Sequence, residues 1–186
     1  MDDNEILDLY WARSEAAIEE TAKKYSRYCH YISYNILCDN GDAEECVNDT
    51  YLRAWNAIPP KRPNNLAAFL GKITRNLSLN KYKQRSAKRR GMGQIELVLA
   101  ELEDCIPSLA GVEDAVDEML LVESINHFLA ALPQIKRRIF IRRYWYMSSI
   151  REISQQYGIS ESKVKTILWR MRKQLKAKLE MEGIVL

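Results

Sequence analysis

The sequence predicts an all-α protein of two small helical domains joined by an acidic linker, with a helix-turn-helix in the second domain. Three observations lead to this fold class. Apolar residues recur with helical spacing, charged residues separate into basic, acidic and basic blocks, and a glycine turn joins two apolar stripes near the C-terminus. The chain has 186 residues, 47% of them hydrophobic, which is enough to build two small apolar cores.

The first domain is expected over residues 1–90 and contains two amphipathic helices. Apolar side chains repeat at i, i+4, i+7, i+8 and i+11 from Val47 to Ile58, and at i, i+3, i+4, i+7 and i+11 from Leu66 to Leu77. Prolines at positions 59, 60 and 63 break the chain between these stripes. Asn64 or Asn65 can cap the second helix, because an asparagine side chain accepts a hydrogen bond from a first-turn amide.

The charge pattern defines the rest of the domain organisation. Residues 61–90 include ten Lys and Arg and no acid, whereas residues 91–123 include nine acids and no Lys or Arg. Turn-forming residues gather at 91–93 and at 107–111. We therefore expect an acidic linker over residues 91–113 and a second basic domain over residues 114–186. The net charge of +3 hides this separation, and the two basic modules indicate a polyanionic partner.

The segment 150–170 has the pattern of a helix-turn-helix. Ser154 is small enough for a second helix to cross closely, and Gly158 can take the positive φ that a sharp turn requires. Ser160 can cap the next helix, whose apolar stripe begins at Val164. This combination is typical of DNA-binding proteins, although an ordinary helical hairpin with a solvated basic face is the alternative.

The outer face of this second helix is expected to enter a major groove. Lys and Arg donate to guanine edges or phosphates, and Ser and Thr contact either. The residues predicted to read DNA are Ser162, Lys163, Lys165, Thr166, Trp169 and Arg170. Those expected to contact phosphates or solvent further along the helix are Arg172, Lys173, Lys176 and Lys178.

The two helices of the first domain differ in character. The helix that starts near Leu66 interleaves Asn76, Asn80 and Tyr82 with basic residues, a mixture suited to bases and phosphates, or alternatively to a solvated charge run. The preceding helix, residues 42–58, begins with acids. Acids in a first turn suit the helix dipole, and they also favour a basic protein partner over DNA.

Three segments, residues 42–58, 66–82 and 132–175, resemble the sigma-70 family, specifically its extracytoplasmic-function (ECF) group. The resemblance implies that the first segment docks on the clamp helices of RNA polymerase core, the second recognises the −10 promoter element and the third the −35 element. It also implies that the acidic linker threads the RNA exit path. Phe69-Leu70 replaces a frequent Trp-Leu, and Asn48-Asp49 replaces a frequent Gln-Glu or Gln-Asp. The aromatic cluster with which housekeeping members open the DNA strands is not evident.

The same resemblance assigns roles to individual residues. At the polymerase interface it places Glu45, Asn48 and Asp49. At the −10 element the expected residues are Arg75, Asn76, Asn80 and Lys83. At the −35 element it points to the outer face of the helix-turn-helix already described.

The sequence therefore predicts a cytoplasmic sigma factor that binds RNA polymerase core and promoter DNA, with an anti-sigma factor as a possible further partner. A stand-alone helix-turn-helix regulator is the alternative. An enzyme is not expected, because no nucleophile elbow, phosphate-binding glycine loop or metal-binding carboxylate cluster is evident, and His30 and His127 are isolated. No cofactor, metal or membrane insertion is expected, and the four cysteines are expected to be reduced thiols.

Overall fold

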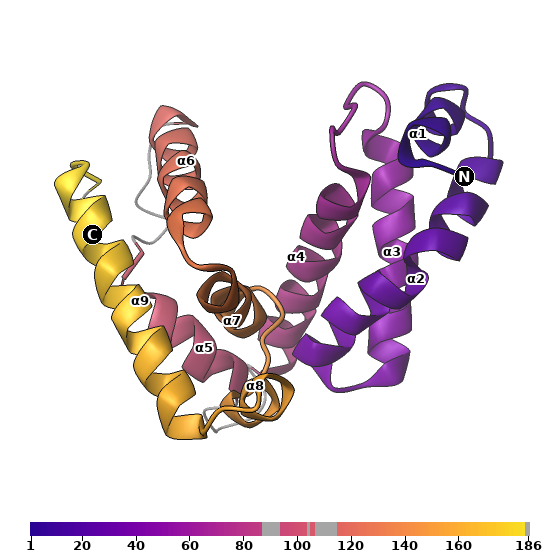
Figure 1. Cartoon of the computed structure of the whole chain (residues 1–186). Helices are drawn as coiled ribbons and strands as arrows, with labels where there is room; N and C mark the ends of the chain where they lie inside the picture. Colours follow the sequence, from indigo (N-terminus) through magenta and orange to yellow (C-terminus); the bar gives the residue numbers. More distant parts are fainter. Residues whose placement is uncertain (87–93, 104, 107–114, 185–186) are drawn as a thin grey trace. The chain divides into compact units, whose positions relative to one another are not determined.

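The computed structural model describes residues 1–86, 94–103, 105–106 and 115–184, and its regular secondary structure there is helical throughout (Figure 1). The predicted all-α fold class is thereby confirmed. The chain divides into two compact units, Met1–Gly91 and Met92–Leu186. Each unit builds its own core, so each is described separately.

The described residues of unit 1 form a bundle of four helices: the last three pack on one another, and the first packs on the second. Their bounds are α1 Asp3–Trp11, α2 Ala16–Leu37, α3 Asn40–Ala57 and α4 Leu66–Ser86. Polar side chains define where these helices start. Asp2 accepts a hydrogen bond from the Glu5 amide, and Asn65 accepts one of 2.8 Å from the amide of Ala68, as expected for a cap.

Hydroxyl pairs inside unit 1 fix how α4 is rotated. The Thr74 hydroxyl lies 3.0 Å from that of Thr50 on α3, and Ser78 donates to Ser33 of α2 over 2.8 Å. These small side chains let the helices approach closely and are fully buried. Because Thr74 and Ser78 are one turn apart and point inward, Asn76 and Asn80 lie on the exposed side of α4.

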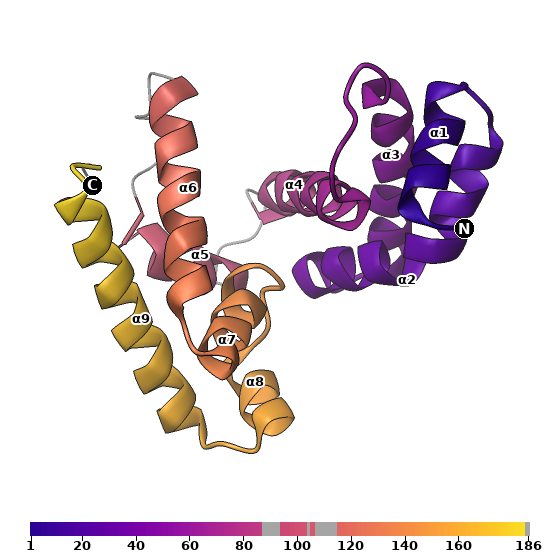
Figure 2. The same cartoon turned by 45° about the horizontal axis from the view of Figure 1, so that its top comes forward.

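The described part of unit 2 contains five helices, with α9 in contact with α6, α7 and α8 (Figure 2). Their bounds are α5 Gln94–Glu103, α6 Ala115–Ala131, α7 Gln134–Tyr144, α8 Ile150–Tyr157 and α9 Glu161–Met181. The inner stripe of α9 is buried at Val164, Leu168, Met171 and Leu175, as its spacing predicts. Because this stripe faces the core, the opposite face of α9 is exposed.

The structure differs from the linker predicted over residues 91–113. Residues 94–103 form helix α5, which packs on α7 within unit 2. Ile95 and Val98, one turn apart, are buried and supply its apolar face. The acid-only composition of this stretch hid a short amphipathic helix, whose Glu101 pairs with Arg143 and Arg172 of the same unit. Residues 107–113 of the predicted linker lie outside the described residues.

Candidate nucleic-acid and protein-binding surfaces

The turn between α8 and α9 has the predicted helix-turn-helix geometry. Gly158 takes φ 62° and ψ 34°, a left-handed conformation that glycine adopts without steric cost. Ser154 is small enough for the helices to cross closely, and its hydroxyl also donates a 2.6 Å hydrogen bond to the carbonyl of Ile159 in the turn. Ser160 accepts a 3.2 Å hydrogen bond from the Lys163 amide and so caps α9. The direction of α9 is therefore fixed at its first turn.

The six residues predicted to read DNA on α9 all lie on its exposed face. Two of them have contacts that limit how they could act. The Thr166 hydroxyl donates to the carbonyl of Ser162 over 3.0 Å, so it offers a ligand its lone pairs and its methyl group. Trp169 is 50% exposed, and the Lys173 ammonium lies 4.5 Å from its ring centroid. Trp169 is thus available at the surface, with a cation beside it.

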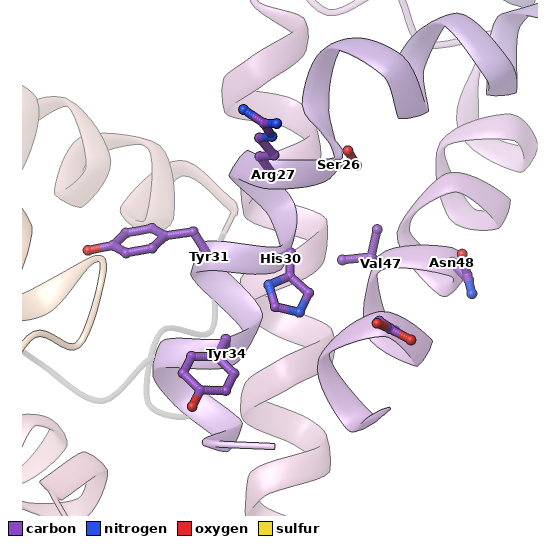
Figure 3. A pocket seen from close by; sticks show the side chains of 8 residues that line it. Ser26, Arg27, His30, Tyr31, Tyr34, Val47 and Asn48 are labelled. Atoms are coloured by element: carbon purple, nitrogen blue, oxygen red, sulfur yellow. The ribbon is translucent and has the colours of Figure 1, made fainter. Parts of the chain in front are cut away.

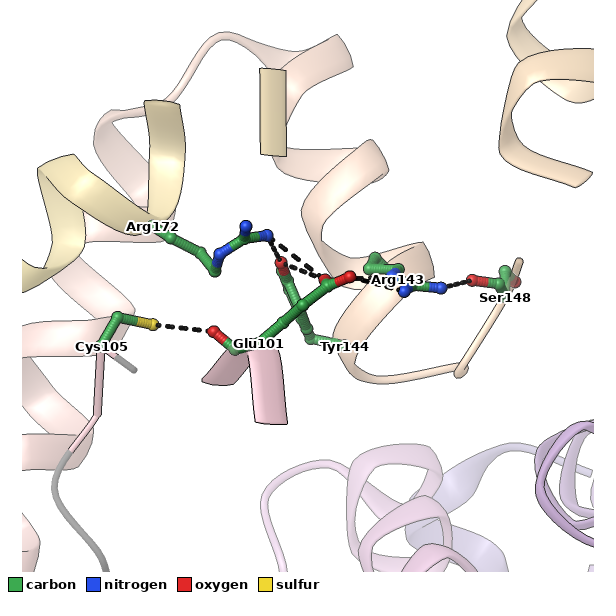
Figure 4. Close-up of polar contacts among 6 residues, drawn as sticks. All are labelled: Glu101, Cys105, Arg143, Tyr144, Ser148 and Arg172. Atoms are coloured by element: carbon green, nitrogen blue, oxygen red, sulfur yellow. Dashed lines mark hydrogen bonds and ion pairs between the residues drawn. The ribbon is translucent and has the colours of Figure 1, made fainter. Parts of the chain in front are cut away.

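The expectation that Arg172 contacts phosphate or solvent is wrong, because this side chain turns into the unit. Its guanidinium donates from Nη1 to Oε2 of Glu101 over 3.2 Å and to the Tyr144 hydroxyl over 2.5 Å (Figure 4). Farther along α9, Lys178 pairs with Glu182. Of the four basic residues expected to contact phosphates or solvent, Arg172 and Lys178 therefore have carboxylate partners, whereas Lys173 and Lys176 are exposed.

Glu101 of α5 is the centre of this polar cluster (Figure 4). Its Oε1 accepts from Arg143 Nη2 over 2.7 Å, and its Oε2 accepts from Arg143 Nε over 3.2 Å and from the Tyr144 hydroxyl over 3.0 Å. Burial alone would raise the pKa of Glu101. The hydrogen bonds and charges of Arg143, Tyr144 and Arg172 outweigh burial and lower that pKa, so the group stays ionised.

The α4 surface presents three of the four residues predicted for the −10 element. Asn76, Asn80 and Lys83 are exposed, at the i, i+4, i+7 spacing that puts side chains on one helix face. Arg75 is the least exposed of the four, and burial lowers the pKa of its guanidinium. We therefore expect Asn76, Asn80 and Lys83 to be more accessible to DNA than Arg75.

The acidic start of α3 is partly neutralised inside unit 1. Lys81 of α4 lies 2.6 Å from a carboxylate oxygen of Glu45 and 3.1 Å from one of Asp42, and Arg85 also pairs with Asp42. Glu45 is therefore an exposed acid with a protein partner. Asn48 and Asp49 are also exposed, and Asp49 has no ion pair among the residues that the structure describes.

Beside the α3 surface lies a groove between α2 and α3 with a volume of about 630 Å³ (Figure 3). The rings of His30 and Tyr34 stack along it, with centroids 5.9 Å apart and planes at 13°. The lining residues are Ser26, Arg27, His30, Tyr31, Tyr34, Glu44, Val47 and Asn48. Sequence reasoning missed this groove because its two walls come from different helices. The exposed tyrosines of α2 were the available signal.

Several other features were sought in the described part of the chain. It contains no group of three or more His, Cys, Asp and Glu side chains that could hold a metal ion. None of its helices combines the length and apolar character needed to cross a bilayer. The cysteines at positions 29, 38, 46 and 105 are free thiols.

Comparisons with known proteins match the two units separately. The family model of Sigma-70 region 2 matches residues 21–88, and that of Sigma-70 region 4 matches residues 123–175. The ECF RNA polymerase sigma factor SigE of Mycolicibacterium smegmatis is 24% identical over 163 residues, which are 85% of this chain and 60% of that protein.

A solved structure of CnrH in complex with the cytosolic domain of CnrY is 16% identical, and the match covers 96% of this chain and 97% of that one at a TM-score of 0.43. At that score we base no conclusion on the likeness. The two matched regions stand in family order, and each falls within one of the helical units described above. The chain therefore belongs to the sigma-70 family, in its extracytoplasmic-function group.

Proposed function

We propose that this protein is a sigma factor, which binds RNA polymerase core and directs initiation by reading the −10 and −35 promoter elements. The observation that carries the proposal is the capped helix α9, which follows the Gly158 turn with Lys165, Thr166 and Arg170 exposed on its first turns. A recognition helix uses those turns to contact base edges in a major groove. The protein would carry out no chemistry of its own and would work in the cytoplasm, beside its polymerase.

The surface of unit 1 supports a division of labour between DNA and polymerase. The exposed face of α4 carries Asn76 and Asn80, whose amides can hydrogen-bond base edges. The exposed acid Asp49 and the amide Asn48 lie on α3, a surface whose charge disfavours DNA and suits a basic protein helix. We propose core polymerase as the partner of α3 and the −10 strand as the partner of α4.

Transcription in vitro tests the function directly. Purified chain and core polymerase would be supplied with a promoter library randomised at both elements, and the transcripts sequenced. Initiation that depends on the chain and enriches one −10 and one −35 sequence is expected. Absence of any chain-dependent transcript would contradict the proposal.

The alternative of a stand-alone helix-turn-helix regulator predicts a different result. Such a protein would bind a specific duplex tightly without core, whereas a sigma factor is expected to gain specific affinity when core is added. A gel-shift titration of the selected promoter, with and without core, separates the two functions. Equal affinity in both arms would favour the regulator.

A further inference from the structure

Helix α5 lies outside both matched family regions, yet it is built into unit 2. The matches end at residue 88 and resume at residue 123, whereas α5 spans Gln94–Glu103. Its Val98 is fully buried, and its Glu101 carries four hydrogen bonds to side chains of α7 and α9. The Glu101 carboxylate is half-buried and ionised, and it joins α5 to α7 and α9.

Glu101 connects to both helices of the helix-turn-helix. Toward α8, the connection runs through Arg143, whose Nη1 donates to the carbonyl of Ser148 over 3.1 Å. Ser148 directly precedes Ser149, the cap of α8. Toward α9, Glu101 accepts directly from Arg172. One carboxylate therefore holds the start of α8 and the middle of α9 at once.

The cluster also lies next to the reading face. A pocket of about 430 Å³ is lined by residues of α5, α7, α8 and α9, and Leu97, Ala100 and Glu101 form its α5 side. On the α9 side lie Lys165, Leu168 and Arg172, spaced i, i+3 and i+7 along one face. Because Lys165 is one of the predicted readers, a shift of α9 against α5 would move a reading side chain.

We propose that Glu101 is a positioning residue for recognition of the −35 element: it fixes α8 through Arg143 and α9 through Arg172, which makes α5 part of the DNA-reading module. This inference rests on the proposed sigma function. Arg143 is 4% exposed, so without Glu101 its charge would be left without its carboxylate partner in the interior, and α7 and α9 would have to readjust.

The test uses the full chain with core polymerase and a −35 element randomised in an otherwise fixed promoter. Glu101→Gln keeps the size of the side chain and removes its charge. Glu180→Gln, an exposed acid of α9, removes the same charge elsewhere and is the matched control. We expect Glu101→Gln to reduce discrimination between the preferred −35 bases and their variants about ten-fold, with the −10 profile unchanged. The control should keep both profiles.

A second variant shows whether the effect passes through the cluster. Arg172→Gln should flatten the same −35 positions, but less than Glu101→Gln does, because it breaks only the connection to α9. The double variant should be no worse than Glu101→Gln alone, because that variant already breaks this connection. The salt slope of binding should not change in Arg172→Gln, since this cation is already paired with Glu101.

The outcomes are distinguishable. A wild-type −35 profile in Glu101→Gln would overturn the inference, and so would a uniform loss of activity with unchanged base preferences, which indicates stability alone. If Glu101→Gln does not fold, Glu101→Asp, which keeps the charge and loses reach, replaces it and should flatten the profile less. A flat −35 profile in the wild-type protein would instead overturn the proposed function, and this inference with it.

Discussion

Replacing Gly158 tests whether the helix-turn-helix depends on backbone conformation or on space. This residue has φ 62°, and a Cβ atom built on it would meet nothing within 4 Å. The cost of a side chain is therefore conformational. An L-residue in the left-handed region costs about 1–2 kcal/mol, and a stiffer backbone in the unfolded chain offsets about 0.4–1 kcal/mol of that for alanine.

We therefore expect Gly158→Ala to destabilise the α8–α9 turn by about 1 kcal/mol and Gly158→Val by about 3 kcal/mol, because a β-branched residue strongly resists positive φ. Gly158→Asn is the matched control, since asparagine is enriched in this conformation, and it should cost less than alanine. The order Asn, Ala, Val follows from backbone preference and does not follow side-chain volume.

Hydrogen exchange of the full chain, followed by mass spectrometry of peptides from α8 and α9, measures these local free energies. Peptides from α2 and α3 report on unit 1 and should not change. The same variants in −35 selection should lose activity in the same order. If Asn is as damaging as Val, the reasoning is refuted, because the site would then be limited by contacts that the structure does not show.

The remaining predictions concern the three proposed binding surfaces. Asp49→Lys should weaken binding to core polymerase measurably in a pull-down titration while helicity is kept. Glu45→Lys should weaken that binding too, and it should also weaken the packing of α3 on α4, because it places a cation beside Lys81. Asn80→Ala should change base preference at the −10 element, whereas Lys83→Ala should lower affinity for all sequences and reduce the salt slope by about one unit. Identical base preferences and salt slopes for the Asn80→Ala and Lys83→Ala variants would contradict the assignment of Asn80 to bases and Lys83 to phosphates. Arg170→Ala should relax preference at one or two −35 positions, by about 1–3 kcal/mol of discrimination, and an unchanged profile in a randomised −35 selection would show that Arg170 does not read sequence.

The helix-turn-helix could be predicted from sequence because each of its requirements falls on a local residue. A turn glycine, a capping serine and an apolar stripe are all set by spacing along one short segment, and the structure confirms them at Gly158, Ser160 and Val164. The cap at Asn65 was predictable for the same reason. Exposure of the α9 reading face followed directly from burial of its opposite stripe.

Contacts between distant segments could not be predicted in this way. Glu101 and Arg172 are 71 residues apart, and the sequence gives no sign that they meet. An arginine in a basic run looks solvated until its partner is located, and Glu101 itself looked like one acid of a linker. The ion pairs of Lys81 with Glu45 and Asp42 could not be predicted either. They join α4 to α3, and the charge pattern had indicated different partners for the basic and the acidic helix.

The docking of α5 also shortens the stretch of chain that joins the two units. With α5 held in unit 2, residues 87–93 alone connect α4 to that unit, and seven residues span at most about 25 Å in any conformation. If the chain were a linker from residue 87 to residue 114, its reach would be about 100 Å. If the protein reads both promoter elements as proposed, a short tether would restrict the spacer lengths that one molecule can bridge. A variant whose α5 comes away from unit 2 should therefore tolerate a wider range of spacer lengths than the wild-type protein.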